Sequence, residues 1–363
     1  MPKRRYVILA EGAFANEQAS KTARGVLRYS EDDVVAVVDS TLAGRDVADI
    51  AASIGRSAPI VARVSDTLAL RPTSLLVGIA PVGGTLPAAF RSQVLAAIEA
   101  GLEIVNGLHD LLRDDEEFVA CAARSGSRLW DVREPTGPLR VFTGEAYDVP
   151  QVVVLAVGSD CSVGKMSTML ELQAAARGGL LEAAFVATGQ TGIMIAGSGI
   201  AVDRVIADYL CGAAEQLVLD IAPSVDVTLV EGQGGIFHPA YAPVTLGLLY
   251  GTAPDALILC HRAGQREIAE FGSPIPPLRA LIAAHEALLA PIKSARCVAV
   301  ALNTSHLGIG DARRAIDEIA AETGLPADDV VRFGGDRLWN AVAAAAAATP
   351  KGAKRKKIAA LTV

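Results

Sequence analysis

Residues 152–168, VVVLAVGSDCSVGKMST, decide the fold of this chain. The apolar, mostly β-branched run 152–157 predicts a buried strand, and the run 169–174 (MLELQA) predicts a helix. A glycine-bearing loop that ends in Gly164 and Lys165 joins them. This order is typical of a phosphate-binding loop, in which backbone N–H groups at a helix N-terminus and a lysine ammonium hold an anion. We therefore predict the main ligand site here.

The size and composition of the chain favour two packed α/β domains. It has 363 residues, of which 51% are hydrophobic, with 34 glycines and 18 prolines. These values suit a packed protein with many tight turns and exclude a disordered one. The net charge of −7 gives no general attraction to nucleic acid. No run is long and apolar enough to span a membrane. We therefore expect neither nucleic acid nor a membrane as a partner.

The five cysteines are scattered, odd in number and never spaced as Cys-x-x-Cys. This pattern predicts neither a disulfide framework nor a zinc site and fits a reducing compartment. The first 14 residues are basic and then briefly apolar, but Glu11 and Gly12 interrupt the apolar run. We therefore predict a cytoplasmic protein without a signal peptide.

Strand-like and helix-like segments alternate over residues 1–143, which predicts a Rossmann-like domain with a parallel sheet. The expected strands are 6–10, 34–38, 60–61, 75–79, 103–106 and 128–132, and the expected helices are 21–29, 87–100 and 107–112. Asp39 closes the second strand, where dinucleotide-binding folds place a ribose-binding acid. The glycine fingerprint of those folds is absent, since only Gly12 follows the first strand. We expect this domain to assist substrate binding or to build a contact in a homo-oligomer.

Prolines and glycines concentrate in residues 133–150, which predicts a linker at 144–150. A second domain, 151–349, and a basic tail, 350–363, follow it. The second domain is expected to be P-loop NTPase-like, with a doubly wound parallel sheet. Its expected strands are 152–157, 184–187, 225–230, 256–260 and 298–302, and its expected helices are 201–211, 276–289, 312–323 and 336–348.

Each expected strand of the second domain is followed by polar sequence, mostly rich in glycine. The loops are 158–165 (GSDCSVGK), 188–192 (TGQTG), 231–239 (EGQGGIFHP), 261–265 (HRAGQ) and 303–306 (NTSH). Because the carboxyl ends of parallel strands meet at one edge of a sheet, these loops should lie together. A purely structural sheet does not need so many such loops, so we predict a composite active site.

The motifs at 158–165 and 231–235 resemble the dethiobiotin synthetase group of phosphate-loop enzymes. In that group the glutamate helps hold a metal and an asparagine after a late strand binds adenine; Glu231 and Asn303 stand at the matching places. Over nearly the whole chain, the set GSDCSVGKMST, TGQTG, VEGQGG and HPAY is similar to the DgcN family, which includes D-glutamate N-acetyltransferases that use acetyl-CoA. The resemblance implies an N-acetyltransferase for an acidic amino acid, D-glutamate, in amino-acid catabolism.

One residue of the loop helps to choose between acyl transfer and nucleotide hydrolysis. An ordinary phosphate loop has Ser or Thr after its lysine, and that hydroxyl binds Mg²⁺. Here the residue is Met166, whose thioether is a poor Mg²⁺ ligand, although Ser167 could compensate. A coenzyme A pyrophosphate needs to be held without a metal, so we expect acetyl-CoA and no metal. The expected cofactor-binding residues are Gly158, Ser159, Cys161, Ser162, Val163, Gly164, Lys165, Met166, Ser167 and Asn303.

Amine acetylation needs a base near the amine and stabilisation of the oxyanion. The candidate bases are His238, which follows a glycine-rich turn, Glu231, which ends an apolar strand, and Asp160, which lies inside the anion-binding loop. Burial would raise the pKa of Glu231 and suit it to this role. Asp160 could instead cap the N–H groups of its own loop or contact a substrate ammonium.

The substrate carboxylates require cationic or amide partners. Arg262 offers a planar fork for bidentate binding, and Gln190 and Thr191 could add hydrogen bonds. The backbone amides of Gly234 and Gly235 are candidates for an oxyanion hole. Cys161 lies where a helix N-terminus and a lysine would favour a thiolate, so an acyl-cysteine is open beside simple packing.

Three hypotheses follow from the sequence. The first is the acetyl-CoA-dependent N-acetyltransferase described above. The second is a ligase or kinase of the dethiobiotin synthetase type that uses Mg-ATP or Mg-GTP, and it predicts Mg²⁺-dependent ADP formation. The third is a nucleotide-sensing protein without turnover, whose first domain carries the output.

Overall fold

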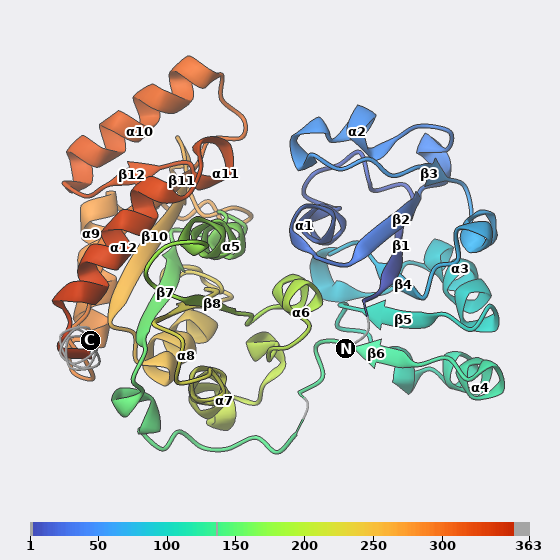
Figure 1. Cartoon of the computed structure of the whole chain (residues 1–363), viewed down its shortest axis with the longest axis horizontal. Coiled ribbons are helices and arrows are strands. Elements are labelled where there is room, and N and C mark those ends of the chain that lie inside the picture. The colour runs from blue at the N-terminus through green and yellow to red at the C-terminus, as the bar shows by residue number, and fades with distance from the viewer. Residues whose placement is uncertain (1–2, 136, 352–363) are drawn as a thin grey trace. The chain divides into compact units, whose positions relative to one another are not determined.

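The computed structural model describes residues 3–135 and 137–351, and these form two compact units (Figure 1). The first unit runs to residue 134 and also includes residues 193–198, while the second holds the remainder of the chain. Each unit contains its own six-stranded sheet, and all the paired strands are parallel. The α/β prediction is therefore confirmed for both halves.

The first sheet has the strand order β3-β2-β1-β4-β5-β6, which is the doubly wound order of Rossmann folds. Its strands are β1 (Arg5–Leu9), β2 (Asp33–Val38), β3 (Ile60–Val61), β4 (Ser74–Val77), β5 (Glu103–Asn106) and β6 (Leu129–Asp131). Its helices are α1 (Lys21–Tyr29), α2 (Val47–Ile50), α3 (Ala88–Glu99) and α4 (Glu116–Ser125). The expected strands all form, with ends that differ by one or two residues.

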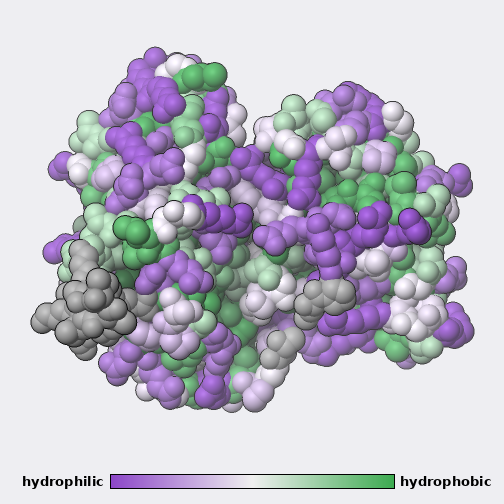
Figure 2. Space-filling model, in the orientation of Figure 1, coloured by the Kyte–Doolittle hydropathy of each residue, from purple (hydrophilic) through white to green (hydrophobic). Residues whose placement is uncertain are grey.

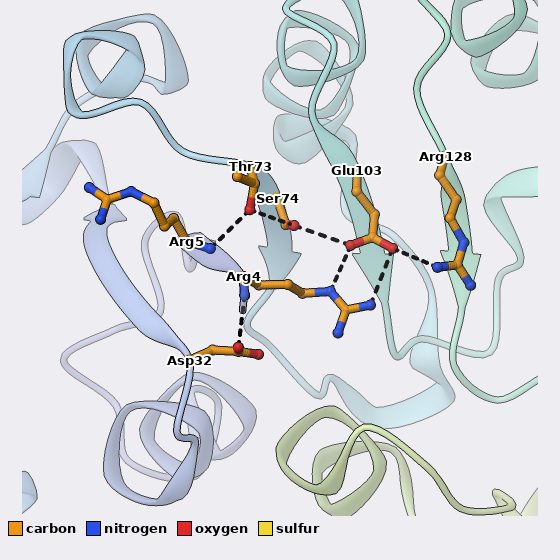
Figure 3. Close-up of polar contacts among 7 residues, drawn as sticks. All are labelled: Arg4, Arg5, Asp32, Thr73, Ser74, Glu103 and Arg128. Carbon is orange, nitrogen blue, oxygen red and sulfur yellow. Dashed lines mark hydrogen bonds and ion pairs between the residues drawn. The ribbon is translucent and has the colours of Figure 1, made fainter. Parts of the chain in front are cut away.

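An ion-pair network closes the amino edge of the first sheet (Figure 3). The Glu103 carboxylate accepts from Arg4 Nε (2.7 Å) and Ser74 Oγ (3.1 Å), and Arg128 Nη1 lies 3.1 Å away. The Arg4 guanidinium also stacks on Trp130, 4.7 Å from the ring centroid. This edge therefore consists of charges that neutralise one another.

The second sheet has the order β12-β11-β10-β7-β9-β8, with β7 in its interior (Figure 1). Its strands are β7 (Val152–Gly158), β8 (Ala183–Val186), β9 (Val227–Val230), β10 (Ala256–Arg262), β11 (Arg296–Asn303) and β12 (Ala327–Asp328). Its helices are α5 (Lys165–Ala176), α7 (Ala207–Leu219), α8 (Ala242–Thr252), α9 (Leu278–Leu289), α10 (Ile309–Thr323), α11 (Val330–Phe333) and α12 (Asp336–Ala348), and α6 (Gln190–Ala196) begins in this unit.

The side chains of β7 alternate between two apolar clusters, as the period of two in a strand requires. Val153, Leu155 and Val157 belong to the cluster that also contains buried residues of α7, α8, α9 and α10. Val152, Val154 and Ala156 belong to the other, with residues of α5 and α12. Helices thus cover both faces of the sheet, and this is why the sequence of β7 is apolar throughout.

Two predicted helices do not form as expected. Residues 201–211 are not one helix, because Val205 and Ile206 are extended; a short 3-10 turn precedes them and α7 follows. Residues 107–112 are not helical, because a side chain from another strand end binds a backbone N–H group that a helix would use: Asp131 Oδ1 accepts from Leu112 N at 3.0 Å.

The motif 188–192, expected as a loop, instead contains the start of α6. Glu231 Oε2 accepts hydrogen bonds from Thr188 N (2.9 Å) and Gly189 N (3.0 Å), just before Gln190 begins the helix. A carboxylate that belongs to another segment therefore supplies the acceptor that a capping residue ordinarily provides.

The expected linker 144–150 is bound closely to the second unit. The buried Glu215 carboxylate of α7 accepts from the backbone N–H groups of Thr143 (2.7 Å), Gly144 (2.8 Å) and Ala146 (3.2 Å). Of the expected basic tail, residues 352–363 lie outside the described part of the chain. Lys351 is half-buried, and its Nζ lies 2.9 Å from Asp255 Oδ2.

Hydrophilic side chains cover most of the face shown in Figure 2, with apolar ones scattered among them. Within residues 3–351, apart from residue 136, no helix combines the length and apolarity that crossing a bilayer requires.

Candidate active site

The loop between β7 and α5 has the backbone shape of an anion site. Gly164 has φ 111°, in the left-handed region that favours glycine, and it precedes α5 as the N-cap. In the described part of the chain, the N–H groups of Val163 and Gly164 have no protein acceptor. The first turn of α5 adds N–H groups without intrahelical acceptors. This loop therefore presents a group of free donors to a bound anion.

Lys165 lies over this loop and is 6% exposed. Its Nζ donates to the Asp160 carbonyl oxygen at 2.7 Å. Burial lowers the pKa of Lys165, although neighbouring groups, Glu231 among them, oppose the shift. Gly232 makes room for the lysine stem: a Cβ there would lie 2.9 Å from Lys165 Cδ and 1.8 Å from the Ala156 carbonyl oxygen.

Glu231 follows β9 directly and is 5% exposed. Burial raises its pKa to about 7, against the opposing effects of the Thr188 and Gly189 N–H groups and of the Lys165 ammonium. The Oε2 atom of Glu231 accepts hydrogen bonds from both of these N–H groups. A carboxyl group with this pKa changes its protonation state near neutral pH, which is the property of an effective general base.

Asp160 is fully buried and joins two loops. Its Oδ2 accepts from Gln265 Nε2 (2.6 Å) and Ala269 N (2.8 Å), and its Oδ1 accepts from Cys161 N (2.6 Å). With three N–H donors, the carboxylate is well suited to fixing the loop after β10 against the phosphate loop. This geometry supports the capping alternative for Asp160.

His238 faces the same carboxylate: its Nε2 lies 3.7 Å from Asp160 Oδ1, and the residue is 3% exposed. The Ala240 N–H donates to Nδ1 of His238 at 3.2 Å. The neutral imidazole therefore carries its hydrogen on Nε2, and there it is a hydrogen-bond donor. This tautomer favours Glu231 over His238 as the base.

A buried pair ties the phosphate loop to β10. Ser159 Oγ and His261 Nδ1 share a hydrogen bond of 2.8 Å, and both residues are at most 5% exposed. Burial lowers the pKa of His261 to about 4, so its imidazole is neutral at pH 7. Ser159 thus takes part in fixing the loop.

The hydroxyls after Lys165 differ in their surroundings. Thr168 is 3% exposed, and the Cys260 thiol donates to its Oγ1 at 3.5 Å, so this hydroxyl faces the core. Met166 and Ser167 are half-buried at the start of α5. Of the hydroxyls that could replace the usual Mg²⁺ ligand, only that of Ser167 remains.

The other predicted residues meet at the carboxyl edge of this sheet. Arg262 ends β10 with an exposed side chain, and Asn303 ends β11, where its Oδ1 accepts from Ser305 N at 3.1 Å. Neither Gly234 N nor Gly235 N has an acceptor within the described residues. Gly235 lies on the phosphate loop, since a Cβ there would be 3.0 Å from the Gly158 carbonyl oxygen.

Gln190 and Thr191 lie at the start of α6, beside Glu231. A Cβ on the next residue, Gly192, would be 2.4 Å from Glu231 Oε2. The backbone just before and just after these two residues therefore contacts Glu231, through Gly189 N and Gly192. Thr191 is 8% exposed, and Gln190 is more accessible.

Part of this site was not predicted. The loop 261–265 was expected at this edge, but the contact of Gln265 with Asp160 was not, nor were Ala269 and Phe271 beyond it. The conformation of this segment depends on Asp160, a contact between residues more than 100 positions apart. Phe271 packs edge-on against His238, with ring centroids 5.2 Å apart, and is 48% exposed. Polar and exposed aromatic residues in one loop were the only signal in the sequence.

Among its described residues, the first unit does not offer a comparable site. Asp39, the candidate ribose ligand, is fully buried, and it accepts from Phe14 N (3.0 Å) and from Thr41 N (3.1 Å) and Oγ1 (2.6 Å). The Asp39 carboxylate is therefore already hydrogen-bonded within its own unit. A hollow of about 560 Å³ lies in this unit at the start of α3, but its arginine, Arg91, is already paired with Asp115.

Comparison with known proteins agrees with this architecture. Residues 140–339 match the model of the DUF1611 family, described as its C-terminal P-loop domain of unknown function, and residues 40–135 match its N-terminal Rossmann-like domain. A DUF1611 protein of Anabaena variabilis, solved by crystallography, has 40% sequence identity and a TM-score of 0.90, over 94% of this chain and 100% of the other.

Two curated relatives carry the name D-glutamate N-acetyltransferase. One, from Tritonibacter scottomollicae, is 39% identical over 277 residues, which cover 75% of this chain and 81% of the relative. The other, from Pseudoalteromonas, is 37% identical over 280 residues, or 76% and 82% of the two chains. The chain therefore belongs to the DUF1611 family, and the predicted Rossmann-like and P-loop domains are confirmed.

Proposed function

We propose that this DUF1611 protein is an N-acetyltransferase that transfers the acetyl group of acetyl-CoA to the amino group of D-glutamate. The observation that carries the proposal is the buried Glu231, whose pKa is raised to about 7 beside an anion-binding loop. Such a carboxylate accepts a proton near neutral pH, as the attack of an amine on a thioester requires. The names of the two curated relatives support the substrate and the group transferred.

The phosphate loop would hold the pyrophosphate of the acyl donor. The free N–H groups of Val163 and Gly164 and the first turn of α5 supply donors, and Lys165 supplies the positive charge. Met166 replaces the usual hydroxyl ligand of Mg²⁺, and Thr168 faces the core. The donor set thus suits an anion that is bound and not hydrolysed.

The loops around this anion site would place the amino acid. Arg262, exposed at the end of β10, binds a carboxylate in a bidentate manner, and Glu231 removes the proton from the attacking amine. The N–H groups of Gly234 and Gly235 stabilise the oxyanion that develops on the acetyl carbonyl. The Arg262 side chain and the N–H groups of Gly234 and Gly235 have no hydrogen-bond partner in the described residues. The carboxyl group of Glu231 has a pKa of about 7.

The reaction is tested by following free thiol release from acetyl-CoA with the purified protein. We expect release with D-glutamate, slower release with L-glutamate, and no effect of a metal chelator. Absence of thiol release with every acidic amino acid would overturn the proposal. Mg²⁺-dependent ADP formation from ATP, without thiol release, would replace it with a ligase or kinase.

Two lysines whose pKa is lowered by burial provide a matched test of the donor site. Lys165→Met should abolish coenzyme A binding in isothermal titration calorimetry. Lys293→Met is the control, because Lys293 is half-buried and also has a pKa lowered by burial, but it is paired with Asp255, 2.6 Å away and before the start of β10. This control should lose stability and keep its coenzyme A affinity. Equal affinity losses in both variants would contradict the assignment of Lys165.

A further inference from the structure

Two half-exposed aromatic rings lie against the buried imidazole of His238. The ring centroid of Tyr241 is 4.7 Å from that of His238, and the centroid of Phe271 is 5.2 Å from it. Tyr241 and Phe271 are each 48% exposed, whereas His238 is 3% exposed. The two rings therefore help to bury the imidazole and still present apolar surface to solvent.

The imidazole connects these rings to the phosphate loop. Nε2 of His238 lies 3.7 Å from Asp160 Oδ1. One ring nitrogen of His238, one carboxylate oxygen of Asp160 and Sγ of Cys161 all lie within 4.8 Å of one another. The apolar surface of Tyr241 and Phe271 thus adjoins the loop that presents its N–H groups to an anion.

The segment after β10 holds Phe271 in a tight turn. Ile268 N donates to the Ser273 carbonyl oxygen at 2.8 Å and closes this turn. Glu270, directly before Phe271, has φ 70°, in the left-handed region that residues other than glycine rarely adopt. The residue before Glu270 donates its N–H to the Asp160 carboxylate at 2.8 Å. The backbone therefore holds an apolar ring in solvent beside the phosphate loop, and exposed apolar surface of this kind is typical of a binding site.

The groups at the two ends of the coenzyme A pyrophosphate differ in polarity. One end is linked to the ribose, which carries hydroxyl and phosphate oxygens. The other end is linked through one methylene to the dimethyl carbon of the pantoyl group. Apolar surface beside an anion site suits the dimethyl group, because contact removes apolar area from water, whereas ribose oxygens would lose their hydrogen bonds to water. The thioester lies at the far end of the same arm and needs no contact with the phosphate loop.

The order of the strands supports the same direction for the donor. Tyr241 follows β9 and Phe271 follows β10, and these strands are the two neighbours of β7 in the sheet. Asn303, at which we expect the adenine, ends β11, the strand beyond β10. The ribose separates adenine from the pyrophosphate, so the more distant strand suits the adenine and the neighbouring segments suit the pantoyl group.

We propose that Tyr241 and Phe271 form the binding surface for the pantoyl part of the acyl donor, an inference that rests on the proposed acetyltransferase function. The phosphate loop holds the pyrophosphate, and the dimethyl group packs against the two rings. The rings thereby direct the arm of the donor away from the phosphate loop.

The pantoyl contact is tested by comparing coenzyme A with ADP, which has the adenosine and the pyrophosphate but no arm. In isothermal titration calorimetry, Phe271→Ala should bind coenzyme A about tenfold more weakly and ADP as tightly as the wild type does. Phe271→Leu should keep most of the coenzyme A affinity, because a contact with methyl groups needs apolar area and not an aromatic ring. In steady-state kinetics, Phe271→Ala should raise the KM for acetyl-CoA about tenfold and leave kcat nearly unchanged.

Tyr147→Ala is the matched control, because Tyr147 is also an exposed aromatic residue of this unit, at 38%, but precedes the amino end of β7. It should leave both affinities unchanged. Equal losses of coenzyme A and ADP affinity in Phe271→Ala, or a loss as large in Phe271→Leu, would overturn the proposal in favour of stacking on adenine.

The inference and the proposed function fail in different ways. Unchanged coenzyme A affinity in Phe271→Ala, with amino-acid acetylation present, would overturn the pantoyl contact and leave the acetyltransferase function intact. Absence of both coenzyme A binding and amino-acid acetylation in the wild type would overturn the proposed function itself.

Discussion

The two sheets use the polar residues at their carboxyl edges in opposite ways, although both sheets are parallel and six-stranded. In the first, Asp39 accepts three hydrogen bonds from neighbouring loops, and Asp131 accepts from Asn106 Nδ2 and Leu112 N. In the second, Glu231 and Lys165 are buried together and have shifted pKa values. The carboxylates of the first edge are hydrogen-bonded within their own unit, whereas the second edge has backbone N–H groups that have no acceptor in the described residues and can bind a ligand.

The contrast shows that burial of a carboxylate does not identify a site. Asp39 is more deeply buried than Glu231 but serves only its own fold. The second edge differs in the groups that lie near its carboxylate. These are a buried ammonium, backbone N–H groups without an acceptor in the described residues, and a loop of anion-binding shape. Perturbed ionisable groups together with unused donors are the mark of a functional edge.

The largest expected effect is on the base at the second edge. Glu231→Gln keeps the hydrogen bonds to Thr188 and Gly189 but cannot accept a proton, so turnover should fall about 10²–10⁴-fold. Steady-state kinetics of thiol release measure this fall. Glu215→Gln, at another buried glutamate of this unit, should lose stability and keep turnover. Equal losses of turnover would remove Glu231 from the mechanism.

The raised pKa of Glu231 also makes stability depend on pH. The folded-state pKa, about 7, lies above the ordinary value of 4.5, so the neutral form is favoured by folding. This contribution is complete below about pH 4.5 and is lost as pH rises through about 7, by about 3 kcal/mol. Activity should change in the opposite direction, rising through pH 7 as the base ionises.

Urea unfolding of the wild type and of Glu231→Gln at pH 5 and pH 8 measures this difference. The variant should gain stability relative to the wild type at pH 8 and gain little at pH 5. If the difference between the two proteins is the same at both pH values, the carboxyl group does not titrate as the structure indicates.

Local sequence was sufficient for the central part of the site. The run 152–168 predicted β7, the phosphate loop and α5, because an apolar strand, a glycine at positive φ and a helix start are determined by neighbouring residues. The chemistry of Glu231 could be expected in part, since it follows an apolar strand. The size of its pKa shift depends first on burial, and then on the opposing effects of the Thr188 and Gly189 N–H groups and of Lys165, all of which are distant in sequence.

Contacts between distant loops could not be predicted in this way. The donors that hold Asp160 come from residues 265 and 269, and the tautomer of His238 depends on the N–H of Ala240. The start of α6 was missed because its N–H acceptor is Glu231, not a neighbour in sequence. Such features arise only when the loops have been brought together.

A smaller effect is expected at the first edge. Asp39→Asn replaces a carboxylate oxygen with an NH₂ group that opposes the donors of Phe14 or Thr41, so the protein should lose about 1–3 kcal/mol of stability. Urea unfolding measures the loss, and thiol release at saturating substrates should be unchanged. A fall in turnover matching that of Glu231→Gln would show that the two edges are not functionally distinct.

The smallest effect is expected at the opposite, amino edge of the first sheet (Figure 3). Arg128 reaches Glu103 Oε1 at 3.1 Å, but its side chain is 58% exposed, so Arg128→Ala should cost less than about 1 kcal/mol. Arg4→Ala should cost more, because Arg4 is only 11% exposed and its loss leaves the mostly buried Glu103 without its closest cation. Urea unfolding of both variants tests the order. Equal costs would show that solvent screens the whole amino edge, and that its charges, unlike those around Glu231, act only weakly on one another.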